Sequence, residues 1–241
     1  MPVTRRHRGP HPQDADMFSE ETQETLRKAV RDLSWLRTRG YAEPSAIKLV
    51  GDRYQLRARQ RVAVGRCACP DEAMAQRQSR RMKPQAVEGM ALELDGLNVL
   101  TTVEVALAGG VLLLGRDGCM RDMASFHGNY RLVQETERAV EILLGVLDSM
   151  RPSDVRIYID RPVSNSGRLA DTIRKAAKRH PVSVDAVLSN RVDEILKMST
   201  VVVATADSAI LDACGPWMNL ARIAVEQHRA ELERFWLVDL A

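Results

Sequence analysis

Three stretches of the sequence run through consecutive apolar residues and end in an aspartate. The stretches are residues 91–95, 155–160 and 201–207. Their final residues are Asp95, Asp160 and Asp207. Apolar runs of this length are typical of strands in a parallel sheet that is covered on both faces. Because the carboxyl ends of parallel strands lie at one edge of a sheet, the sequence predicts an acidic pocket at that edge.

The segments between and after these stretches alternate between helical and extended patterns. Helices are predicted at residues 132–150, 168–179 and 191–198 and from residue 208 onward, and one further strand at residues 182–188. This alternation with short turns predicts an α/β fold. It indicates a three-layer α/β/α arrangement around a mainly parallel, Rossmann-like sheet.

Two parts of the second half are harder to assign. Hydrophobic alternation across residues 101–108 favours a strand, with residues 109–110 as a hairpin turn into a second strand at 111–114. A short helix over the first of these segments is the alternative. At the end of the chain we predict a helix over residues 217–234 and an edge strand at 235–238.

The front of the chain is predicted to be helical and basic. An amphipathic helix begins at Ser19 and ends at Gly40, and Pro44 lies in the first turn of a second helix. Asp52 is positioned to cap a third helix, and the polar residues 71–84 indicate a helix followed by a linker. The predicted organisation is a disordered basic arm at 1–17, a helical basic domain at 18–84 and an α/β domain at 85–241.

Charge is divided unequally along the chain. Residues 1–91 contain 18 Lys and Arg against 11 Asp and Glu, a balance of +7, whereas the rest of the chain balances at −4. On the predicted third helix Arg53, Arg57 and Arg61 recur every four residues and would share one face. That face either contacts the phosphates of a nucleic acid such as RNA or pairs with the acidic half of the chain.

Cysteine spacing and the apolar runs exclude other classes of protein. Cys67 and Cys69 are separated by one residue and no second pair follows at zinc-ligand spacing, so reduced thiols are expected. The N-terminal residues contain no apolar core of a secretory signal, and the longest apolar run, residues 105–114, is too short to cross a bilayer. We therefore expect a soluble, cytoplasmic protein without a membrane partner, whose oligomeric state the sequence leaves open.

Four aspartates form the first candidate site: Asp95, Asp160, Asp193 and Asp207. Several carboxylates at one sheet edge repel one another unless a hard cation neutralises them. Mg²⁺ or Mn²⁺ held by Asp95, Asp160 and Asp207 would suit attack on a phosphodiester. The alternative is that aspartate is a common helix N-cap, which accounts for Asp193 and Asp207 without a metal.

A polar loop follows the strand at 155–160 and forms a second candidate site. Ser164, Asn165, Ser166 and Gly167 precede a predicted helix, so their backbone N–H groups and hydroxyls could bind an anion such as a nucleotide phosphate. The loop lacks the lysine and the glycine spacing of a P-loop. Helix capping alone would also account for this composition.

A third polar cluster, residues 117–122, includes Asp117 and Cys119 and is followed by His127, Asn129 and Tyr130. These side chains either contact a substrate or form the rim of a hairpin. No Ser or Cys partner can be placed beside His127, which argues against a nucleophilic triad.

Several of these motifs together resemble a known but uncharacterised family. The motifs are residues 48–54, 59–61, 95–99, 116–118, 121–122 and 164–167. The front half of that family is catalogued as domain of unknown function 434, and the resemblance extends from about residue 25 to residue 212. It implies no established activity.

The back half also resembles the PIN/NYN nuclease fold. In that fold a first strand ends in an aspartate with an asparagine close behind, as at Asp95 and Asn98. A later aspartate heads a helix, as at Asp193, and the following strand ends in Thr-x-Asp, as at Thr205 and Asp207. The resemblance implies that these carboxylates bind Mg²⁺ or Mn²⁺ and that the protein cleaves RNA.

The sequence therefore predicts a metal-dependent ribonuclease whose helical front domain binds RNA. Asn98 and Ser164 would orient water or phosphate. Two other hypotheses remain open at this stage. One is a non-catalytic module that binds RNA or a nucleotide at residues 164–167, and the other is an enzyme acting on a small phosphorylated molecule.

Overall fold

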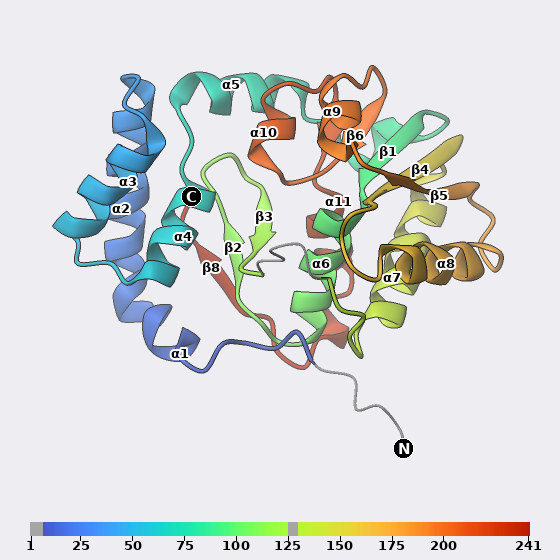
Figure 1. The fold of residues 1–241 in the computed structure, drawn as a ribbon, viewed down its shortest axis with the longest axis horizontal. Helices are drawn as coiled ribbons and strands as arrows, with labels where there is room; N and C mark the ends of the chain where they lie inside the picture. Colours follow the sequence, from blue (N-terminus) through green and yellow to red (C-terminus); the bar gives the residue numbers. More distant parts are fainter. Residues whose placement is uncertain (1–6, 125–129) are drawn as a thin grey trace.

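The structure is a computed structural model that describes residues 7–124 and 130–241. A five-stranded parallel sheet lies at one end of the molecule and helices from the front of the chain lie at the other (Figure 1). The sheet has the order β5-β4-β1-β6-β7. Its strands are β1 (Ala91–Asp95), β4 (Asp154–Asp160), β5 (Val184–Ser189), β6 (Val202–Ala204) and β7 (Trp217–Met218). The predicted α/β class and parallel sheet are thus confirmed.

Both faces of this sheet are covered by helices, which explains why most residues inside its strands are apolar. Leu92 and Leu94 of β1 point into the larger core, with Ile157 beside them on β4. The opposite face carries Tyr158, Val203 and Trp217 into a smaller core. The larger core contains α6 (Gly96–Leu107), α7 (Thr136–Met150), α8 (Ser166–Ala177) and α11 (Leu220–Gln227), and the smaller one α9 (Val192–Lys197) and α10 (Ser208–Leu211).

The strand order places β1 at the centre of the sheet. The chain passes from β1 to β4 and β5 on one side and then returns to β6 and β7 on the other. In parallel sheets a crevice forms at the carboxyl ends of the strands where this direction reverses, and ligands commonly bind there. Here that position is the carboxyl end of β1 and β6.

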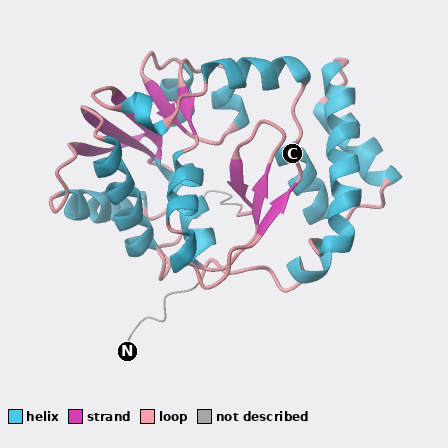
Figure 2. Cartoon of the chain, turned by 180° about the vertical axis from the view of Figure 1, so that it is seen from behind, coloured by secondary structure: helices cyan, strands magenta, loops and turns pink. Residues whose placement is uncertain are grey.

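A second, three-stranded sheet lies between the five-stranded sheet and the front helices (Figure 2). Its order is β3-β2-β8, with β2 (Leu112–Leu114) antiparallel to β3 (Met120–Asp122) and parallel to β8 (Leu237–Asp239). The turn of the β2–β3 hairpin contains residues 116–118. The C-terminal residues do pair as an edge strand, in this second sheet.

The front helices pack against this second sheet. They are α1 (Asp14–Met17), α2 (Glu20–Thr38), α3 (Glu43–Arg53), α4 (Ala58–Cys67) and α5 (Asp71–Arg80), and a short 3₁₀ turn, η1 (Pro84–Val87), follows them. Their core includes Leu26 and Val64 from the helices and Leu113 and Val238 from the sheet. The helical unit is therefore completed by residues from the C-terminal half of the chain, on the far side of the predicted boundary near residue 84.

The predicted strand at residues 101–108 is wrong, because these residues belong to helix α6. This helix is buried on nearly every side, so its apolar pattern carries no helical periodicity that would separate it from a strand. Gly109 has a φ of +67° and ends the helix, and the N–H of Gly110 donates to the carbonyl of Val105. The two glycines thus form a helix C-cap and not a hairpin turn.

Three predictions for other segments are also corrected. Helix α3 continues to Arg53, so Asp52 lies inside it and does not cap a third helix. Residues 14–17 form α1, where the fully buried Asp14 pairs with Arg59, although disorder was expected up to residue 17. Residues 217–218 form β7, and the helix expected there begins at Leu220.

His127 and Asn129 lie outside the described residues. Among the residues that are described, no helix combines the length and the apolar character needed to cross a membrane.

Candidate functional site

A cavity of about 960 Å³ lies between the carboxyl edge of the five-stranded sheet and helices α3 and α4. The strand edge and the elements beside it supply five aspartates, and the front helices supply three basic residues and one acid, Glu43. The aspartates are Asp95, Asp122, Asp160, Asp193 and Asp207; the basic residues are Lys48, Arg61 and Arg66 from the helices and Arg121 from β3. The structure thus brings together all four aspartates of the first candidate site.

Asp95 ends β1 and caps helix α6. Its carboxylate accepts a hydrogen bond from the backbone N–H of Asn98 at 3.4 Å and one from the hydroxyl of Thr205 at 3.0 Å. A Cβ at the next residue, Gly96, would lie 2.7 Å from the carbonyl oxygen of Tyr158, so only glycine lets the helix begin this close to β4.

Burial, together with the negative charges of Asp207 and Asp160, raises the pKa of Asp95 to about 7, against the hydrogen bonds from Thr205 and Asn98. Burial and the charge of Asp193 likewise raise the pKa of Asp160. These shifts show that the four carboxylates interact electrostatically across the cavity.

The other aspartates differ in whether their side chains cap a helix. One oxygen of Asp207 caps α10 by accepting from the N–H groups of Ala209 and Ile210 at 2.8 and 3.1 Å. Asp193 lies in the first turn of α9, whose N-cap is Arg191, so the capping explanation holds for Asp207 but not for Asp193. None of the four aspartates has an ion pair within the described ranges.

The donor set suits a hard divalent cation. Within the part of the chain that the structure describes, no three Asp, Glu, His or Cys side chains converge closely enough to enclose a metal ion. Mg²⁺ is commonly held by only one or two carboxylates, with waters and substrate phosphates completing its shell. Asp207 can supply one such ligand, because only one of its carboxylate oxygens accepts a hydrogen bond from the described residues and the other is available for a cation.

Helices α3 and α4 supply the basic wall. Lys48 contacts Asp52 at 2.8 Å, and Arg61 contacts the same carboxylate at 2.8 Å while also donating to the carbonyl of Leu56. Arg66 donates to the carbonyl oxygens of Asp122 and Ala124. These contacts hold the guanidinium groups at the cavity wall.

Only one of the three arginines predicted to share a helix face reaches this cavity, namely Arg61. Because α3 ends at Arg53 and α4 begins at Ala58, Arg53 and Arg57 are not on the same helix as Arg61. Arg53 lies 3.6 Å from Asp32, and Arg57 lines a separate cavity of about 400 Å³. Lys48 was not predicted as a site residue, although it begins one of the motifs that carried the family resemblance.

The polar loop of the second candidate site does not line the cavity. Ser164 and Asn165 both donate to the carbonyl of Tyr130, at 3.3 and 2.8 Å, and Ser166 donates to the carbonyl of Arg161 at 3.1 Å. Asn165 has a φ of +64° at the start of α8. The loop side chains thus bind carbonyl groups elsewhere in the backbone, and the N-cap residue Asn165 makes no side-chain hydrogen bond to the start of α8.

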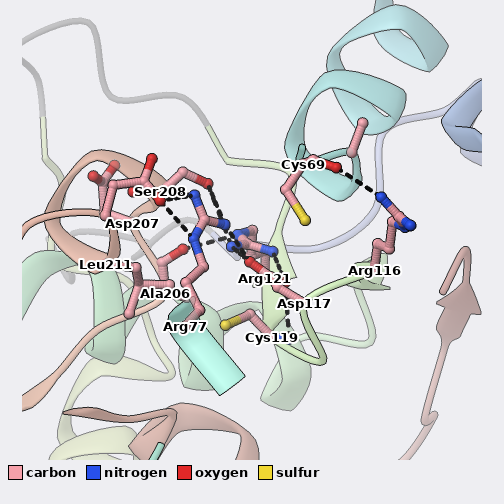
Figure 3. A network of polar contacts seen from close by, with 12 residues as sticks. Cys69, Arg77, Arg116, Asp117, Cys119, Arg121, Ala206, Asp207, Ser208 and Leu211 are labelled. Carbon is pink, nitrogen blue, oxygen red and sulfur yellow. Dashed lines mark hydrogen bonds and ion pairs between the residues drawn. The ribbon is translucent and has the colours of Figure 1, made fainter. Parts of the chain in front are cut away.

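The third polar cluster forms part of a buried network beside Asp207 (Figure 3). Asp117 accepts from Arg77 at 2.5 Å and from two nitrogens of Arg121 at 2.6 and 2.8 Å. Burial alone would raise the pKa of Asp117, but hydrogen bonds and charge from Arg121 together with the charge of Arg77 hold it well below its usual value. Cys119 is buried, and burial raises the pKa of its thiol to about 12, so it is a poor nucleophile.

All four cysteines are buried and free of disulfides, as expected for reduced thiols. Burial raises the pKa of Cys67 to about 12, and the pKa values of Cys69 and Cys214 are also raised by burial. We therefore assign no chemistry to these thiols.

The fold and site define an α/β protein with a five-stranded parallel sheet, an acidic strand edge and a preceding set of helices. Residues 84–223 match the family described as Domain of unknown function (DUF5616), and residues 25–80 match Protein of unknown function (DUF434). Because the first match covers more than half of the chain, the protein belongs to the DUF5616 family. The predicted relation to domain of unknown function 434 is confirmed.

A curated relative is an uncharacterized protein of Methanocaldococcus jannaschii. It is 30% identical over 187 residues, which cover 78% of this chain and 89% of the relative. No solved structure matches the chain. The family matches do not support the resemblance to the PIN/NYN fold, which stays a prediction.

Proposed function

We propose that the protein is a phosphodiesterase that depends on Mg²⁺ or Mn²⁺ and cleaves RNA. The observation that carries this proposal is the cavity in which four aspartates, none of them ion-paired within the described part of the chain, lie with Lys48, Arg61 and Arg66. The acidic side offers ligands for a cation, and the basic side offers contacts for the phosphates that a polyanion brings.

One or two of Asp95, Asp160 and Asp207 would bind the cation, with waters and substrate phosphates completing its shell, and Asp193 adds negative charge beside Asp160. A cation bound there supplies polarisation of a phosphate oxygen and a more acidic water. The side-chain oxygen of Asn98 accepts from the N–H of Ala206 at 2.8 Å, which leaves its amide nitrogen for a phosphate oxygen or a water. Lys48 is exposed at the opposite wall and can neutralise a flanking phosphate.

A PIN-like architecture is the finer part of this proposal. Its support is the Thr-x-Asp segment at the end of β6, in which the Thr205 hydroxyl donates to Asp95 while Asp207 lines the same cavity. Asn98 lies one helical turn after Asp95, and its side chain contacts the backbone just before Asp207. The motif residues of separate strands therefore support one another at one edge of the sheet.

The experiment that tests the proposal is cleavage of single-stranded RNA in the presence of Mn²⁺. We expect cleavage by the unaltered protein, and only background cleavage by the double variant Asp95→Asn and Asp207→Asn. The matched control is Asp171→Asn, which removes an exposed carboxylate of α8 outside the cavity and should leave cleavage unchanged. Full cleavage by the double variant would reject the proposal.

A further inference from the structure

Two buried arginines hold the backbone on both sides of Asp207 (Figure 3). Arg121, on β3, donates from Nε to the carbonyl of Ala206 at 2.8 Å. Arg77, on α5, donates from Nη2 to the carbonyl of Ser208 at 3.2 Å. The segment that presents Asp207 to the cavity is therefore fixed by two side chains that lie far from it in sequence.

Both arginines share the buried carboxylate of Asp117, which is 1% exposed in the ion pair with each of them. Two nitrogens of the Arg121 guanidinium group donate to the carboxylate of Asp117, and the third donates to the carbonyl of Ala206. Such planar, multidentate contacts fix the orientation of a guanidinium group more tightly than a lysine could be fixed. Arg77 has a second carboxylate, Asp212, at 2.7 Å, so the group of four side chains is close to neutral.

Arg121 also lines the cavity that contains the unpaired aspartates. A guanidinium group at this position could pair with Asp207 and remove the negative charge that a cation needs. It does not do so, because Asp117 occupies two of its nitrogens. The network thus fixes the Asp207 segment and engages the guanidinium group of Arg121 with Asp117 instead of Asp207.

We propose that Asp117 is a positioning residue for the acidic site, acting through Arg77 and Arg121 to fix Asp207 and to hold the charge of Arg121 away from it. This inference rests on the proposed function in one respect, which is that the four aspartates bind a divalent cation. Buried ion networks of this kind are better explained by a specific arrangement than by net stability, because desolvation offsets much of their attraction.

The test compares Mn²⁺ affinity, measured by calorimetry, in three variants of the full chain. Asp117→Asn should weaken Mn²⁺ binding by roughly tenfold or more, because a released Arg121 competes for the aspartates. Adding Arg121→Met to that variant should restore most of the affinity, since it removes the competing charge. Asp212→Asn is the matched control, because it removes a half-exposed partner of Arg77 and leaves Asp117 in place.

A structural role alone would not predict this recovery, because the double variant lacks more of the network than the single one. Unchanged affinity in folded Asp117→Asn, or a double variant as weak as the single one, would overturn the inference. If Asp117→Asn does not fold, Arg121→Lys provides the same test. It keeps the charge but cannot make all three contacts, so we expect weaker Mn²⁺ binding, and unaltered binding would overturn the inference.

A second measurement without metal separates this inference from the proposed function. The N–H groups of Ala209 and Ile210 bond to Asp207, so their hydrogen exchange reports how well that segment is held. We expect Asp117→Asn to speed exchange at these two amides more than in the β1 strand. If the unaltered protein binds no Mn²⁺, the proposed function fails. Equal exchange in the variant and the unaltered protein would overturn the positioning role.

Discussion

Two groups of acids in this protein differ in their surroundings: Asp117 is buried within an arginine network, whereas only Asp95 is buried among the four aspartates at the strand edge. Asp117 lies between two arginines and its pKa is lowered, whereas Asp95 lies among other carboxylates and its pKa is raised to about 7. Asp14 and Glu104 are also buried and each pairs with an arginine, although burial raises the pKa of Glu104. Within the described residues, arginines therefore pair with these three buried acids and with none of the four aspartates at the strand edge, where the proposed cation or substrate would supply the positive charge.

The largest expected effect is a difference in the free energy of unfolding between variants of the two groups of acids. Asp117→Asn leaves two buried guanidinium groups without their shared partner and should lower the free energy of unfolding by about 3–5 kcal/mol. Asp160→Asn removes a charge that burial and Asp193 already disfavour, so stability should change by less than about 0.5 kcal/mol or rise. Urea unfolding at neutral pH measures both changes. Equal losses in the two variants would remove the distinction between the groups.

The next effect is a dependence of stability on pH that belongs to Asp95. Its pKa is about 7 in the folded protein and near 3.8 in the absence of perturbation, so the folded protein retains the proton in that interval. The contribution of Asp95 to the free energy of unfolding is therefore greatest below pH 3.8. It decreases by up to about 4 kcal/mol as the pH rises toward 7. Relative to Asp95→Asn, the unaltered protein should therefore become less stable between about pH 4 and pH 7. A difference that stays constant over that range would contradict the raised pKa.

The smallest effect concerns the basic wall that faces the acids. Lys48→Ala should weaken RNA binding several-fold and reduce the slope of log affinity against log salt by about 1, because one phosphate contact is lost. Arg53→Ala is the matched control, since Arg53 is an exposed residue near the end of the same helix but does not line the cavity. Salt-dependent binding titrations compare the two. Identical slopes for both variants would remove Lys48 from the site.

The sequence predicted the acidic edge because its signal is local: each apolar run ends in its aspartate, and parallel strands align those ends. Helix α6 was mistaken for a strand because it is buried on almost all sides, which removes the periodicity that distinguishes the two. The prediction that Arg53, Arg57 and Arg61 share one helix face was wrong because the chain breaks between α3, which ends at Arg53, and α4, which begins at Ala58. The position of that break was not evident from the sequence.

The network around Asp117 could not be predicted from local patterns. Arg77 reaches Asp117 across 40 residues of sequence and Ser208 across 131, and neither separation leaves a periodic signal. The same holds for β8, which pairs with β2 at the other end of the α/β half. Contacts of this kind follow from the tertiary fold and not from any single segment.

Direct measurement of Mn²⁺ binding at about pH 8 is the closest test of the claim that the aspartates at the strand edge bind a divalent cation. The account predicts binding by the unaltered protein and by Asp171→Asn, and its loss in the double variant Asp95→Asn and Asp207→Asn. Absence of binding in the unaltered protein, or equal binding in the double variant, would contradict it.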